Sequence, residues 1–192
     1  MIVKSFCRAE NFQQITNIKE GVDLVRFTKK PLISEVYEDG KPTGRYEDTG
    51  YVTFTEANVK GGVTVDKLIP LRLEELAAYD ASEEVNIFYV NGKKMWFDKV
   101  TRTCIVYSMQ TEKASGATET TLYDNDNVPY VLPIDAAIQM FGALELYAKA
   151  CYNKTAEHAV AIKALESVQD VLDYDITVGY PEKLTFNLTV AE

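Results

Sequence analysis

Histidine and cysteine are scarce in this chain of 192 residues, and their scarcity argues against several kinds of site. The sequence has one histidine, His158, and three cysteines, Cys7, Cys104 and Cys151, which lie far apart and form no Cys-x-x-Cys pair. An odd number of widely separated cysteines fits neither a disulfide framework nor a zinc cluster. We interpret the thiols as buried and reduced, and we expect neither a metal site nor a cofactor.

The sequence also lacks clusters of positive charge and long apolar runs. The formal net charge is −9, and no run of Lys or Arg exceeds two residues. A nucleic-acid partner is therefore not expected, because binding needs a basic face that releases counterions. No apolar run is long enough to span a bilayer, and the first residues show no apolar core with a cleavage site. We expect no membrane partner and a chain made in the cytoplasm without an export signal.

Motifs for nucleotide binding and for serine hydrolysis are missing, so an enzyme is not expected. The sequence contains no Gly-x-x-x-x-Gly-Lys-Ser/Thr, no Gly-x-Gly-x-x-Gly and no Gly-x-Ser-x-Gly. A Cys151–His158 dyad would need contact at about 3 Å. On one continuous helix, seven residues separate two side chains by about 10 Å along the axis.

The same segment predicts an interruption rather than a continuous helix. Asn153-Lys154 breaks the apolar spacing, and Thr155 can cap a second helix. We therefore interpret Cys151 to His158 as the corner between two packed helices. His158 has no ligand partner three or four residues on, so it is interpreted as a helix-start or interface residue.

Residues 1–84 are predicted to be rich in β-structure, which the many tyrosines and phenylalanines favour. Expected strands are 22–28, 33–37, 51–55 and 63–65, with turns at 39–44 and 61–62 where Gly and Pro gather. The segment 71–79 is ambiguous between a short helix and a strand. No linker or repeat is apparent.

Residues 85–192 mix hairpins with helices. Asn91-Gly92 between two strand-like runs, 85–90 and 93–97, predicts a type I′ hairpin. Asp98 can cap a helix over 99–114 that Gly116 ends. Its apolar residues fall at helical spacing in two sets: Val100, Cys104 and Tyr107, and Ile105 and Met109.

The remainder predicts a second hairpin, a pair of helices and a last strand. Strands over 118–123 and 128–132 would be joined by a turn at 124–127, which lacks the Gly and Glu of a calcium loop. A helical stripe runs from Ala137 to Cys151, and Ser167 can cap one last turn. Alternation over 184–190 indicates a closing strand. The fold class is thus α+β, with a β-rich part (1–84) and a part with β-hairpins, a helical hairpin and a closing strand (85–192).

Residues from about 91 to 186 resemble a known domain family. The resemblance is carried by Val90-Asn-Gly-Lys-Lys-Met-Trp96, Ala143-Leu-Glu-Leu-Tyr-Ala148, Cys151-Tyr152, His158 and the closing Tyr174-Asp-Ile-Thr-Val-Gly-Tyr-Pro181. This pattern is similar to a family of unassigned function in bacteriophage and prophage proteins of gut Bacteroidetes. It is also similar to the C-terminal domain of phage tail-fibre and tail-fibre-assembly proteins, where a Trp usually stands at the position of Tyr180.

The resemblance implies a function but no catalytic residues. It implies a bacteriophage structural protein of the tail, baseplate, fibre or head appendage. Such a protein would be found in the virion, and in the host cytoplasm during assembly, as a homo-oligomer bound to other phage structural proteins. A tail-fibre assembly chaperone is the alternative, followed by an enzyme or small-molecule binder of a mobile element. Candidate contact or structural residues are Trp96, Tyr147, Tyr152, His158, Tyr174 and Tyr180.

Overall fold

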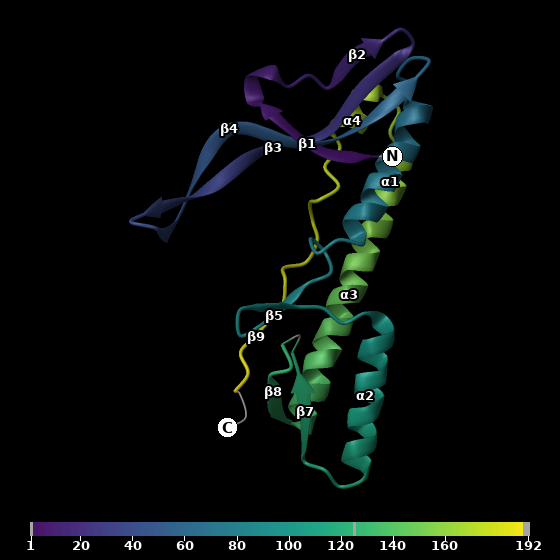
Figure 1. The fold of residues 1–192 in the computed structure, drawn as a ribbon. Helices are drawn as coiled ribbons and strands as arrows, with labels where there is room; N and C mark the ends of the chain where they lie inside the picture. Colours follow the sequence, from purple (N-terminus) through teal and green to yellow (C-terminus); the bar gives the residue numbers. More distant parts are fainter. Residues whose placement is uncertain (1, 125, 190–192) are drawn as a thin grey trace. The chain divides into compact units, whose positions relative to one another are not determined.

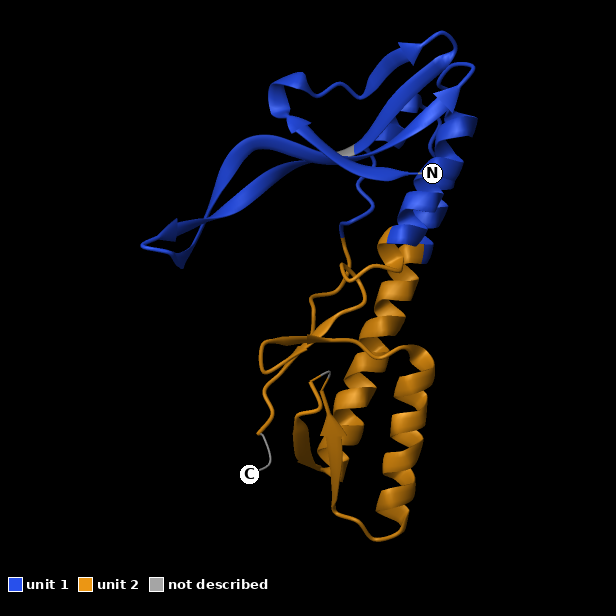
Figure 2. Ribbon diagram, in the orientation of Figure 1, with its two compact units in different colours: residues 1–78, 156–178 blue, residues 79–155, 179–192 orange. Residues whose placement is uncertain are grey.

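The computed structural model describes residues 2–124 and 126–189, and the chain forms two compact units (Figures 1 and 2). Unit 1 contains the residues up to Ala78 together with Ala156–Val178, and unit 2 contains Tyr79–Thr155 together with the residues from Gly179 onward. The α+β class is confirmed. The first change of unit lies near the division predicted at 84/85. No signal in the sequence indicated that 156–178 join the N-terminal unit.

Unit 1 is built on a four-stranded antiparallel sheet in the order β1-β4-β3-β2. Its strands are β1 (Val3–Arg8), β2 (Ile15–Lys19), β3 (Val22–Glu38) and β4 (Lys41–Lys60), with a 3-10 turn at Ala9–Asn11. The two strands expected over 22–28 and 33–37 are one long strand, β3. The strand expected at 63–65 is wrong, because helix α1 begins at Val65.

Two helices, α1 and the short α4, make the core of unit 1 together with the sheet. Helix α1 (Val65–Asp80) resolves the ambiguous segment 71–79 as helix, although Pro70 lies within it. Helix α4 (Val168–Asp173) is capped by Ser167, whose hydroxyl accepts from the N–H of Asp170 as predicted. The buried core residues are Val25, Phe27, Ala57, Val59, Leu68, Val171 and Leu172.

Unit 2 contains the hairpin and the helix that the sequence predicted most sharply. Strands β5 (Phe88–Val90) and β6 (Lys93–Met95) pair antiparallel, and Asn91 and Gly92 between them have φ of 50° and 79°. Positive φ at both turn residues is the type I′ pattern. Helix α2 (Lys99–Ala114) has the predicted bounds, and Asp98 accepts from the N–H of Thr101 at 2.8 Å.

The second hairpin of unit 2 is confirmed, and the closing strand is shorter than expected. Strands β7 (Glu119–Tyr123) and β8 (Pro129–Pro133) pair antiparallel. The turn predicted at 124–127 includes Asn125, which lies outside the described residues. Strand β9 (Thr185–Phe186) pairs in parallel with β5. Residues 187–189 are not strand, and Val190 lies outside the described residues.

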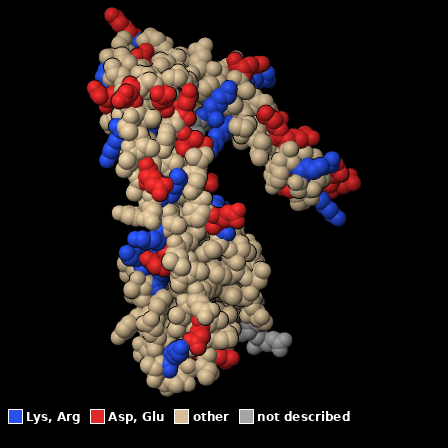
Figure 3. Space-filling model, turned by 180° about the vertical axis from the view of Figure 1, so that it is seen from behind, with Lys and Arg blue, Asp and Glu red and all other residues tan. Residues whose placement is uncertain are grey.

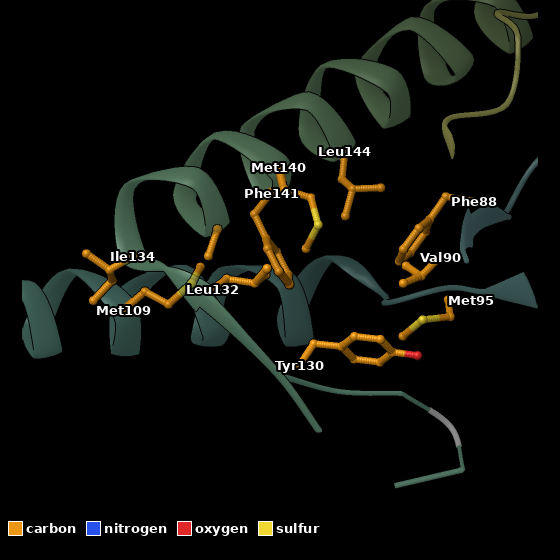
Figure 4. Close-up of a cluster of buried hydrophobic side chains, with 11 residues drawn as sticks. Phe88, Val90, Met95, Met109, Tyr130, Leu132, Ile134, Met140, Phe141 and Leu144 are labelled. Carbon is orange, nitrogen blue, oxygen red and sulfur yellow. The ribbon is translucent and has the colours of Figure 1, made fainter. Parts of the chain in front are cut away.

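The core of unit 2 joins both hairpins to α2 and the first half of α3 (Figure 4). Phe88, Met109 and Leu144 are buried almost completely, and Phe97 stacks on Phe141 with ring centroids 5.7 Å apart. Of the two apolar sets on α2, Met109 is buried and Ile105 packs against the core, whereas Val100, Cys104 and Tyr107 are exposed. The expectation of buried thiols is therefore wrong for Cys104 and right for Cys151.

Helix α3 (Ile134–Lys163) is one continuous helix of 30 residues, so the predicted helical hairpin is wrong. The Thr155 hydroxyl, expected to cap a second helix, instead donates to Oδ1 of Asp80 at 2.6 Å. The apolar stripe from Ala137 to Cys151 is on the buried side as expected. None of the helices among the described residues combines the length and the apolar character needed to cross a membrane.

Candidate functional sites

A pocket lies in unit 2, beside Trp96 and Cys151. Its volume is about 360 Å³, which is enough for one large side chain or a ligand of similar size. Its lining residues are Asp80, Ala81, Val85, Asn86, Trp96, Asp98, Lys99, Arg102, Ala148, Cys151 and Tyr152. The wall therefore mixes an indole ring, two acidic and two basic side chains and small apolar groups.

Arg102 holds the α2 side of this pocket in place. Its guanidinium lies 5.1 Å from the centre of the Trp96 ring, donates to the carbonyl oxygen of Phe97 at 2.6 Å and pairs with Glu145 of α3 at 3.1 Å. A buried guanidinium is stable only when its donors are satisfied, and these partners come from two separate places in the chain, the segment before α2 and helix α3. The arrangement fixes α2 against α3 and orients the indole.

Four of the six candidate residues from the sequence gather around this pocket. Trp96 meets Tyr147 edge to face at 6.5 Å, and the buried Tyr147 hydroxyl donates to the carbonyl of Val85 at 2.8 Å. Tyr152 lines the pocket and is exposed. The hydroxyl groups of Tyr180 and Thr155 lie 2.9 Å apart, and the Thr155 hydroxyl donates onward to Asp80. Tyr147 is a structural residue, whereas Tyr152 presents an open ring.

The Cys151 thiol at this pocket is poorly suited to nucleophilic chemistry. It is buried, and burial raises its pKa above the usual thiol value, so the neutral form persists at neutral pH. The continuous helix α3 separates it from His158 by about 10 Å along the axis. Contact between thiol and imidazole is therefore excluded.

His158 and Tyr174, the other two candidates, form a buried pair in unit 1. The imidazole Nε2 lies 2.9 Å from the Val178 carbonyl oxygen, so it carries a proton and donates it. Nδ1 lies 2.8 Å from the Tyr174 hydroxyl, within hydrogen-bond distance. The interpretation of His158 as a helix-start residue is wrong, because it lies well inside α3. The pair ties the segment after α4 to α3.

Arg72 is a buried charge in unit 1 that no sequence pattern indicated. Its guanidinium lies over Phe27, pairs with Glu75 and donates to the carbonyl of Tyr174. Glu75 also accepts from the hydroxyl of Thr55. Burial lowers the pKa of Arg72, although Glu75 opposes that shift. These partners belong to α1, to the sheet and to the segment after α4, so the cluster joins α1 to both.

The acidic turn of unit 2 is anchored by hydrogen bonds to Asp124. Asp124 accepts from the N–H groups of Val128 and Asp126, both at 2.9 Å, and from the Tyr130 hydroxyl at 3.1 Å. Lys93 pairs with it at 3.0 Å. Hydrogen bonding from the Val128 amide and these other partners lowers the pKa of Asp124 to about 2. No cluster of three or more potential metal ligands occurs among the residues that the structure describes.

A different kind of site is the outer half of the β3–β4 hairpin, residues 31–50, which we call the arm. Strand β1 pairs with β4 only at Tyr51–Glu56, and β2 pairs with β3 only at Val22–Val25. The arm is thus a two-stranded ribbon that extends past the other strands of unit 1 (Figure 1). None of its side chains, all of which the structure describes, is buried.

The arm carries large apolar side chains into solvent. Ile33, Tyr37 and Tyr46 are 56%, 62% and 61% exposed. Charged side chains are spread along the same ribbon (Figure 3). Because Asp39 and Gly40 have φ of 51° and 74°, the tip is a tight two-residue turn. An isolated two-stranded ribbon is marginal in water, so the arm is a segment that contact with another surface would stabilise.

Compared with protein-family models, with curated proteins and with solved structures, the chain matches none of them.

Proposed function

We propose that this protein is a non-enzymatic structural protein of a bacteriophage particle, which acts through protein–protein contacts made first by the arm. The phage assignment rests on the resemblance of residues 91–186. The observation that carries the contact function is the arm itself, whose 20 residues bury no side chain. Its two strands also leave their outer edges unpaired, and an open edge can add a strand from a partner.

The chemistry of the arm defines the surface that it would contact. Tyr37 and Tyr46 supply rigid aromatic area of the kind enriched at interfaces. Within 33–48, acidic side chains outnumber basic ones by five to two. The partner surface should therefore be apolar at its centre and neutral or basic at its rim.

The first test is mass spectrometry of purified particles of the phage that encodes the chain. A structural protein should be present at a fixed stoichiometry relative to other tail or head proteins. If the chain is absent from particles but bound to a fibre protein in the lysate, it is an assembly chaperone. If it is absent from both, the structural proposal is overturned.

The second test asks whether the arm makes the contact. The triple variant Ile33→Ser, Tyr37→Ser, Tyr46→Ser should be missing from particles while the protein still folds, because these side chains contribute little to the isolated chain. The matched control is Ser34→Ala with Glu47→Gln, which changes exposed polar residues of the same arm. Normal incorporation of the triple variant would contradict the role of the arm.

A further inference from the structure

The pocket beside Trp96 has the mixed apolar and polar wall that small-molecule sites have. Helix α3 presents Ala148, Cys151 and Tyr152 to it, and their spacing of three and then one places them on the same side of that helix. The volume of about 360 Å³ is at the lower end of the range for such sites. It therefore suits a ligand of about the size of one amino acid.

The pocket wall carries four charged side chains, and two of them are already engaged within the protein. Arg102 pairs with Glu145 of α3 at 3.1 Å. The carboxylate of Asp98 caps helix α2. The charges that are left are one anion, Asp80 at the end of α1, and one cation, Lys99 at the start of α2.

Asp80 is half-buried and held in a fixed position. Its Oδ1 accepts from the hydroxyl of Thr155 at 2.6 Å, and its backbone carbonyl accepts from the side-chain amide of Asn86 at 2.5 Å. A hydroxyl does not neutralise a carboxylate, and Asp80 makes no ion pair with any residue in the described part of the chain. Taking a carboxylate out of water is costly unless a cation meets it. Asp80 is thus a fixed acceptor for an ammonium group from outside the chain.

Lys99 brings the opposite charge to the same pocket on a flexible stem. It is exposed, and among the residues that the structure describes it has no acidic partner, Asp80 included. An ammonium group on a four-carbon stem can turn towards a carboxylate that enters the pocket. Trp96, Val85 and Ala148 belong to the same wall and offer apolar contact to the rest of a ligand.

We infer that this pocket binds a free α-amino acid with an apolar side chain. The ammonium group of the ligand meets Asp80, its carboxylate meets Lys99, and its side chain packs on Trp96. A zwitterion satisfies both unpaired charges at once, whereas a simple amine or a simple carboxylic acid satisfies one and leaves the other. The inference goes beyond the proposed function, because it concerns unit 2 and not the arm, and each can fail without the other.

Fluorescence of Trp96, the single tryptophan, reports on this pocket directly. Titration of the purified chain with L-phenylalanine and with L-leucine should give a saturable change in emission for at least one of them, and calorimetry should give the same affinity. Phenylalaninamide lacks the carboxylate and N-acetylphenylalanine lacks the ammonium group, so each should bind at least about tenfold more weakly than phenylalanine. With leucine as the ligand, leucinamide and N-acetylleucine serve in the same way.

Two outcomes of these titrations would overturn the inference. One is the absence of binding by both amino acids at millimolar concentration, in fluorescence and in calorimetry alike. The other is an amide that binds as tightly as its amino acid, which would mean that the pocket takes the first residue of a peptide instead of a free amino acid.

Variants of the pocket wall test the assigned contacts. Lys99→Met and Asp80→Asn should each weaken binding at least about tenfold, and Asn keeps an acceptor for Thr155. Lys149→Met is the matched control, since Lys149 is an exposed lysine of unit 2 that does not line the pocket. Ala148→Phe should fill the pocket and abolish binding while circular dichroism stays that of the wild type. Wild-type affinity in Lys99→Met or in Ala148→Phe would contradict the site.

Discussion

The two halves of the β3–β4 hairpin share one hydrogen-bonded ladder but have opposite environments. In the inner half, Val25, Phe27, Val52, Phe54 and Val59 are buried. In the arm, no side chain is buried. The backbone pairing continues through both halves with only local register shifts. Strand pairing alone therefore does not bury side chains here, and the helices that cover the inner half do.

The cover over the inner half comes from segments distant in sequence. Leu68 of α1 and Val171 and Leu172 of α4 pack on Val25 and Phe27. Burial of this kind stabilises by about 25 cal/mol for each Å² of apolar surface removed from water. The arm has no such cover from the described residues of unit 1, so its apolar residues are exposed on that unit.

The largest expected difference in unfolding free energy is between two aromatic residues, one in each half of β3. Phe27→Ala should lower the free energy of unfolding of unit 1 by about 3–5 kcal/mol, because Phe27 is fully buried. Tyr37→Ala, in the arm, should change it by less than about 0.5 kcal/mol. Urea unfolding, monitored through hydrogen exchange of the β4 amides, would measure the change in unfolding free energy for both variants. Similar losses for the two variants would mean that the arm packs on its own unit.

A second comparison sets the anchored turn of unit 2 against the open tip of the arm. The pKa of Asp124 is lowered from the usual 3.8 to about 2 in the folded state, so its carboxylate stabilises the fold fully above about pH 4. That contribution should be lost as the pH falls from about 4 to 2. Asp124→Asn should remove this acid dependence and destabilise unit 2 at neutral pH.

The matched control for Asp124 is Asp39→Asn at the tip of the arm. Asn tolerates the positive φ of that position, and the side chain of Asp39 is exposed. The change should leave acid unfolding as it is. Fluorescence of Trp96, the single tryptophan, follows unit 2 during an acid titration. An unchanged acid transition in Asp124→Asn would contradict the anchoring role.

Local signals in the sequence predicted local structure well. Asp98 and Gly116 marked the ends of α2, and Asn91-Gly92 marked the β5–β6 turn, because caps and tight turns depend on residues within a few positions. The helix break predicted at Asn153-Lys154 was wrong because a local capping signal was overridden by a distant contact. Thr155 is a good cap in isolation, but its hydroxyl is bound by Asp80, a residue 75 positions away.

Properties that depend on distant partners could not be predicted. Both apolar sets on α2 have helical spacing, and only the packing of α2 in the folded unit, with Met109 in the core and Arg102 paired with Glu145 of α3, shows which side is buried. The arm and the inner half of β3 look alike in sequence, since the cover that separates them comes from α1 and α4. The pocket beside Trp96 was missed because α2, α3 and the segment before β5 meet there only in the folded chain.

The smallest expected effect separates two glycines that occupy the same turn position in different surroundings. Gly40 at the tip of the arm and Gly92 between β5 and β6 both have positive φ, 74° and 79°. Alanine in that conformation costs about 1–2 kcal/mol in either turn. Strand β5 contributes Phe88 and Val90 to the core, so in Gly92→Ala the strain should appear in global unfolding of unit 2. In Gly40→Ala the arm can open alone, so faster amide exchange within 33–48 should be the main change. An equal shift in global unfolding for both variants would show that the arm is coupled to a core, and the contrast between its two halves would then fail.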